Sequence, residues 1–92
     1  MPDPAPLALP AMGPPLKRSV TIDGHRTSVS LEDAFWRDLR EIAKRRATSP
    51  AGLIAAIDHA RPPDVGLATA VRLFVLAEVK AGTTLAATPS GA

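Results

Sequence analysis

A chain of 92 residues with no cysteine has room for one small domain and cannot form a disulfide, and its net charge of +2 alone does not identify a partner. It lacks the apolar run of ~20 residues that a transmembrane helix needs, and it lacks the basic start and apolar run of a signal peptide. We therefore expect a cytoplasmic protein without a membrane partner. Because a unit of about 65 residues buries only ~60% of its surface, and no metal-ligand cluster is visible, we expect stabilisation by a second copy.

The two ends of the chain differ in composition from its middle. Six of the ten prolines lie in the first fifteen residues, and the last eleven residues are uncharged and mostly small. We expect a disordered proline-rich leader at residues 1–16, one domain at residues 17–81 and a flexible tail at residues 82–92. Eight basic and five acidic residues lie between Lys17 and Arg46, a net charge of +3, and the later charges cancel. A basic half and a neutral half suggest one face that binds a polyanion and another part that packs. The alternative is that these charges only form a solvated surface.

Residues 17–31 predict a β-hairpin. Apolar and polar residues alternate along this segment. The Asp23-Gly24 pair in its middle suits the two positions of positive φ in a type I′ turn. The turn places Ile22 opposite His25 and Val20 opposite Thr27, on the face of Val29 that suits a core. The other face is polar and basic, with Lys17, Ser19, Thr21, Arg26, Ser28 and Ser30.

The next segment predicts a helix over residues 32–46. Ser30 and Asp33 have the spacing of a capping box at its start. Trp36 lies beside the apolar stripe, where it would cover an edge of the core or contact a second subunit. The stripe itself has helical spacing and is formed by Leu31, Phe35, Leu39 and Ile42.

Two further helices follow. Ser49 and Pro50 are a capping residue and a first-turn proline, so they predict the start of a helix over residues 50–60. A third helix is expected over residues 67–81, with Gly82 as its end. Its broad apolar surface predicts burial on two sides, including between subunits. We expect its charged residues Arg72 and Glu78 to lie on the surface or in a dimer contact.

The order of strand, helix, tight turn and serine-capped helix in residues 26–57, RTSVSLEDAFWRDLREIAKRRATSPAGLIAAI, resembles the ribbon-helix-helix family of DNA-binding proteins. The longer block from Lys17 to about Lys80 resembles a bacterial subgroup with an additional third helix. The resemblance implies a mainly α fold with a short β-ribbon, built as an intertwined homodimer. One strand from each subunit would pair into a ribbon that enters the major groove of double-stranded DNA. The implied function is sequence-specific transcriptional regulation, as a repressor or autorepressor.

The resemblance also implies which residues contact DNA. Arginine can bind guanine through two hydrogen bonds, and serine can bind several base edges. The implied base contacts are Arg26, Ser28 and Ser30. The start of the second helix would bind a phosphate, and the implied groups are Ser49 and the free N–H groups of Ala51 and Gly52. Further phosphate contacts are expected from basic side chains, namely Lys44, Arg45, Arg46, Lys17 and Arg18.

Three departures from the family pattern bear on this interpretation. Two of the three expected base-contacting residues are serine, where the family often has basic or amide side chains. The turn between the first two helices lacks a glycine, so Arg46 or Ala47 must take the reversal, at a cost of ~1–2 kcal/mol if it is left-handed. The hairpin also adds a strand, and four strands at ~4.8 Å spacing are wider than a ~12 Å major groove. Residues 17–22 would therefore swing aside, or the groove is entered differently.

Other functions have less support. We expect that the protein is not an enzyme and has no cofactor, because the chain lacks a glycine-rich phosphate loop, a nucleophile elbow and an HExxH motif. Asp23, His25 and Ser28 are close in sequence and have the residue types of a catalytic triad. The hairpin, however, would place His25 and Ser28 on opposite faces. The alternative is an antitoxin or a protein-interaction adaptor. An antitoxin extension is usually a polar tail that folds on its toxin, whereas the apolar third helix favours self-association.

Overall fold

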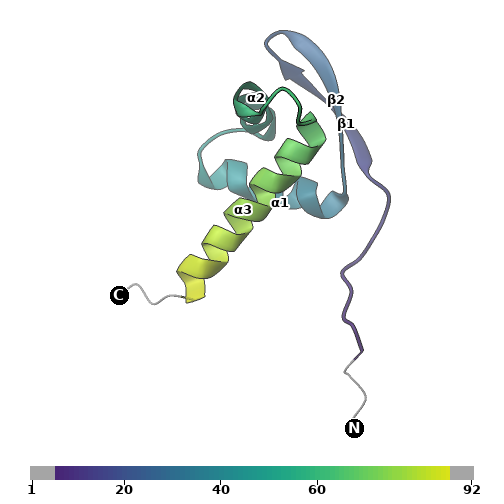
Figure 1. Ribbon diagram of the computed structural model, residues 1–92, viewed down its shortest axis with the longest axis vertical. Coiled ribbons are helices and arrows are strands. Elements are labelled where there is room, and N and C mark those ends of the chain that lie inside the picture. Colours follow the sequence, from purple (N-terminus) through teal and green to yellow (C-terminus); the bar gives the residue numbers. More distant parts are fainter. Residues whose placement is uncertain (1–5, 88–92) are drawn as a thin grey trace.

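The computed structural model describes residues 6–87, and the side chains of residues 6–82. In this part of the chain a two-stranded antiparallel hairpin is followed by three helices (Figure 1). The elements are β1 (Leu16–Ile22), β2 (His25–Leu31), α1 (Asp33–Arg45), α2 (Pro50–Ala60) and α3 (Leu67–Ala87). The three helices contact one another, while α2 also packs against β1 and α3 against β2. None of the described helices is long and apolar enough to cross a membrane.

The hairpin has the predicted register, with Ile22 opposite His25 and Val20 opposite Thr27. Asp23 and Gly24 have φ angles of 52° and 80°, as a type I′ turn requires. One face of the hairpin joins the core through the buried side chains of Ile22, Val29 and Leu31. The opposite face is polar and exposed at Lys17, Ser19, Thr21, Arg26 and Ser28, and half-buried at Ser30.

The first helix begins differently from the prediction. Its N-cap is Glu32, and no side chain caps its first turn. Because Ser30 remains in β2, the predicted capping box with Asp33 is wrong. Backbone bonds from Phe35 and Trp36 to the Glu32 carbonyl start the helix instead. The Glu32 carboxylate binds Arg72 of α3, 2.9 Å from its Nε, so a distant helix fixes this end.

Trp36, rather than Phe35, is the aromatic residue of the α1 core. Trp36 is 2% exposed, and its Nε1 donates a hydrogen bond of 2.9 Å to the carbonyl of Leu16. Phe35 is half-buried and lies beside Arg72, whose guanidinium carbon is 5.9 Å from the ring centroid. The expectation that Trp36 lies at an edge is therefore wrong, whereas Phe35, expected in the core, is only half-buried and packs against it. The buried residues of α1 are Trp36, Leu39, Ile42 and Ala43.

Ala47 makes the reversal between α1 and α2. It has a φ of 55°, which confirms one of the two predicted positions. The Thr48 N–H donates to the Ala43 carbonyl at 2.9 Å and the Ala47 N–H to the Lys44 carbonyl at 3.1 Å. These two bonds form a Schellman motif, in which glycine usually occupies the left-handed position.

The third helix is longer than predicted and is buried on one side. It passes through Gly82 to Ala87, so the prediction that Gly82 ends it is wrong. Gly82 does not have a positive φ, and a glycine inside a helix costs only about 1 kcal/mol. Val71 and Val75 are buried in the core.

Two of the three charged residues of α3 form ion pairs within the described chain. Arg72 binds Glu32, and Glu78 lies 2.7 Å from Arg46. These two ion pairs join α3 to both ends of α1, and the expectation that Arg72 and Glu78 lie on the surface or in a dimer contact stays a prediction.

Candidate nucleic-acid interface

The polar face of the hairpin brings the three predicted base-contacting residues together. Arg26, Ser28 and Ser30 alternate along β2, so their side chains share one face of the sheet. In the antiparallel register they lie opposite Thr21, Ser19 and Lys17. No carboxylate of the described residues forms an ion pair with Arg26. The Arg26 guanidinium is therefore available to an external acceptor.

The outer edge of β2 has no strand partner within the described chain. The type I′ turn closes with a hydrogen bond between Ile22 and His25, and the hydrogen-bonded positions then alternate along the strand. The backbone N–H and C=O groups of Arg26, Ser28 and Ser30 consequently point away from β1. Arg72 occupies one of them, because its Nη2 lies 3.3 Å from the Ser30 carbonyl oxygen. The half of this edge nearer the hairpin turn can therefore pair with a further strand.

The start of α2 has a different hydrogen-bond arrangement from the one expected. Ser49 is the N-cap, and its Oγ accepts a hydrogen bond of 3.0 Å from the Gly52 N–H. The expectation that this N–H is free is therefore wrong. The Ala51 N–H lies in the first turn, where no helical carbonyl can pair with it. A Cβ at position 52 would lie 2.7 Å from Thr48 Oγ1, so glycine permits the close approach of this hydroxyl.

Two of the three basic residues at the end of α1 have neighbours on α3. Arg46 binds Glu78, and its guanidinium carbon lies 5.5 Å from the Phe74 ring centroid. Arg45 lies beside Gly82 of α3. Lys44 is exposed. Two of the three predicted phosphate-contacting side chains of this segment thus lie against α3.

The hairpin also separates Lys17 from Arg18. Lys17 is exposed on the polar face, opposite Ser30. Arg18 belongs to the face of Val29, and its guanidinium carbon lies 5.2 Å from the Trp36 ring centroid. The geometry gives Arg18 a cation–π contact with the core, and its predicted phosphate contact stays a prediction.

Sequence reasoning missed a contact between the hairpin tip and α2. His59 Nε2 lies 2.7 Å from Asp23 Oδ2. The hydrogen bond and the negative charge of Asp23 raise the pKa of His59 above its usual value. These residues are 36 positions apart, and no local pattern links them. Asp23 therefore pairs with His59, while His25 and Ser28 lie on opposite faces of β2.

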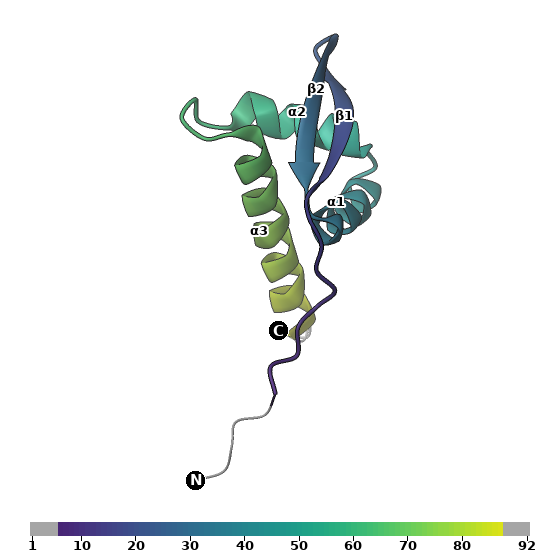
Figure 2. The same cartoon turned by 90° about the vertical axis from the view of Figure 1, so that its right-hand side faces the viewer.

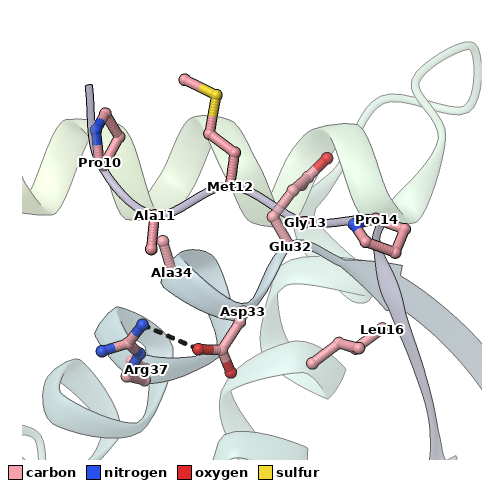
Figure 3. Close-up of a pocket in the computed structure, with 10 residues that line it drawn as sticks. All are labelled: Pro10, Ala11, Met12, Gly13, Pro14, Leu16, Glu32, Asp33, Ala34 and Arg37. Carbon is pink, nitrogen blue, oxygen red and sulfur yellow. Dashed lines mark ion pairs between the residues drawn. The ribbon is translucent and has the colours of Figure 1, made fainter.

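An open, mainly apolar pocket lies where residues 10–14 pass the start of α1 (Figure 3). Two of its lining residues carry carboxylates, Glu32 and Asp33. Asp33 is 2.8 Å from Arg37 within the pocket. A hydrogen bond from its own backbone and the contact with Arg72 lower the pKa of Glu32. Both carboxylates are paired with arginine, so the pocket presents an ion-paired rim rather than an acid–base pair.

Comparison with known proteins agrees with this arrangement. A family model described as a ribbon-helix-helix domain matches residues 15–79, from the residue before β1 into α3. No curated protein and no solved structure gives a significant match.

Proposed function

The chain belongs to the ribbon-helix-helix family of DNA-binding regulators, and from that premise we propose that it is a homodimeric transcriptional repressor that reads DNA through its hairpin. The observation that supports this most strongly is the position of Arg26 and Ser28. Both side chains are exposed on the polar face, and both belong to the strand whose outer edge has no partner within the described chain. A repressor of this kind would act in the cytoplasm, without a cofactor.

The dimer forms through the outer edges of two β2 strands. An antiparallel edge is self-complementary, because each strand offers alternating donors and acceptors to its copy. The outward-pointing groups of β2 belong to Arg26, Ser28 and Ser30, and the Ser30 carbonyl already accepts a hydrogen bond from Arg72. Pairing two copies aligns their pleats, so the two polar faces become one surface with two Arg26 side chains.

This joined surface enters the major groove. A bidentate contact between Arg26 and guanine gives ~1–3 kcal/mol of discrimination, and Ser28 and Ser30 add contacts with less base preference. Four strands span ~14 Å between their outer axes, which exceeds the ~12 Å groove. The two β2 strands therefore occupy the groove, and each β1 strand lies toward a groove wall. Lys17 on β1 then faces a backbone phosphate.

The start of α2 binds a second phosphate. The Ser49 hydroxyl and the Ala51 N–H are the donors there, and the positive helix end favours an anion. The Gly52 N–H would donate to this phosphate only if it gave up its hydrogen bond to Ser49. Lys44 adds attraction at longer range. The contacts of Arg45 and Arg46 with α3 compete with their predicted phosphate roles.

The test uses selection of bound sequences from random double-stranded DNA by the full-length chain. Arg26→Ala should weaken binding to the selected sequence by about 5- to 150-fold, which corresponds to ~1–3 kcal/mol. The matched control is Arg40→Ala, since Arg40 is an exposed arginine on α1, and it should retain affinity. Affinity should also fall steeply with salt because phosphate contacts release counterions. Failure to enrich any sequence would contradict the proposal and favour the adaptor or antitoxin role.

A further inference from the structure

The outer side of α3 is apolar and open to solvent. Leu73, Leu76 and Val79 are exposed at 58%, 47% and 39%. We define these three residues as the α3 outer face. They follow one another at spacings of three residues, so they lie along one side of the helix. Leu73 and Leu76 lie away from the buried Val71 and Val75, and Val79 borders the buried side.

This face continues from the open edge of β2. Figure 2 shows β2 between β1 and α3, and α3 packs against β2. Arg72 marks the side of α3 that faces this edge, because it reaches the Ser30 carbonyl. Leu76 follows Arg72 by four residues, about 40° around the helix, and Val79 follows it by seven, about 20° to the other side. The α3 outer face therefore borders the edge of β2.

Phe35 widens the same surface. Its ring is half-buried beside Arg72 and leaves part of its area to solvent. Arg72 itself does not make this region strongly cationic, because its guanidinium binds the Glu32 carboxylate at 2.9 Å. Two copies can approach here without bringing two unpaired charges together.

We propose that the α3 outer face packs against the same face of a second copy and forms the apolar part of the dimer interface. This inference rests on the dimer of the proposed function. Three side chains fall far short of the ~800 Å² per partner of a standard interface, so the face must belong to a larger contact. The edge of β2 contributes hydrogen bonds but has one polar face and one face already buried against its own helices. The two adjoining surfaces together offer both hydrogen bonds and apolar area.

The first measurement is the oligomeric state of the full-length chain by light scattering over a range of concentrations. Wild type should be a dimer, and Leu76→Glu should raise the dimer dissociation constant by at least about tenfold, because charged groups are costly at an interface core. Ala81→Glu is the control. Ala81 is exposed on the same helix, about 140° around it from Leu76. Circular dichroism of each variant checks that the fold persists.

The second measurement uses the absence of native cysteine. Leu76→Cys should form a covalent dimer with a short bifunctional maleimide, whereas Ala81→Cys should not. A dimer that Leu76→Glu leaves intact, with no cross-linking at position 76, would overturn the inference, and retained DNA binding would leave the proposed function standing. A monomeric wild type would contradict both proposals.

Discussion

Ala47 occupies a backbone conformation that favours glycine, and this permits a quantitative test. Its φ of 55° lies in the left-handed region, which costs a residue with a Cβ about 1–2 kcal/mol. The side chain of Ala47 is exposed, so its methyl group gains little from burial. The hydrogen bonds of this turn involve only backbone atoms, and a glycine can make them equally well.

Ala47→Gly should therefore stabilise the protein. Removal of the left-handed strain gains ~1–2 kcal/mol, and the greater freedom of glycine in the unfolded chain costs ~0.4–1 kcal/mol. The net expectation is a gain of about 0.5–1 kcal/mol in the free energy of unfolding. For a domain of this size that corresponds to a rise of roughly 2–8 °C in Tm.

The assay is urea unfolding at one fixed protein concentration, since a dimer's stability depends on concentration. Ala56→Gly provides the matched control, because Ala56 is an exposed alanine inside α2. The same loss of a methyl group there should destabilise the protein by about 1 kcal/mol. If Ala47→Gly were no more stable than wild type, the assignment of strain to this turn would be refuted.

Two further predictions concern the core and the hairpin tip. Leu39 is fully buried, so Leu39→Asp should abolish folding, because lost packing (~2–5 kcal/mol) and an unpaired buried charge together approach the whole stability of a small domain; circular dichroism should show an unfolded chain, whereas Arg40→Asp should remain folded. The pKa of His59 is raised by Asp23, so the stabilisation from this pair is fully present below the unfolded pKa of 6.5 and is lost as pH rises through the higher folded value. Wild type should exceed Asp23→Asn in stability more at about pH 5.5 than at about pH 8.5, and an equal difference at both would argue against the pair.

The hairpin was predictable because its signals are local. A type I′ turn depends on two adjacent residues, Asp23 and Gly24, and the register follows from the turn. The alternation of side chains then decides which residues are buried and which form the polar face. The shared face of Arg26 and Ser28 was therefore accessible from the sequence alone. The same holds for the Ser49 cap, whose partner is only three residues away.

Which side of α1 is buried was not predictable in this way. Phe35 and Trp36 are adjacent, and either could lead an apolar stripe of helical spacing. The choice depends on the Leu16 carbonyl, which binds the Trp36 Nε1 from 20 positions away. A capping box that involves Ser30 also looks plausible locally. The capping box does not form because β2 extends to Leu31, whose side chain is completely buried.

The basic segment at the end of α1 shows the same limit for the candidate site. Its composition suggested a phosphate-binding cluster near the start of α2. In the structure Arg46 binds Glu78, 32 positions later in the chain, and Arg45 lies beside Gly82, while the phosphate contacts stay a prediction. A third helix that passes α1 thus decides which cations remain available, and its path is a tertiary property.

Arg72 connects the two proposed surfaces of the molecule. Its guanidinium contacts the Glu32 carboxylate at the start of α1 and the Ser30 carbonyl at the edge of β2. The same side of α3 carries Leu76, on the proposed dimer face. If a second copy packs on α3, it also fixes the helix that positions this end of β2. The orientation of β2, the strand proposed to read DNA, would then depend on the third helix as well as on strand pairing, which gives a physical reason for the family match to extend into α3.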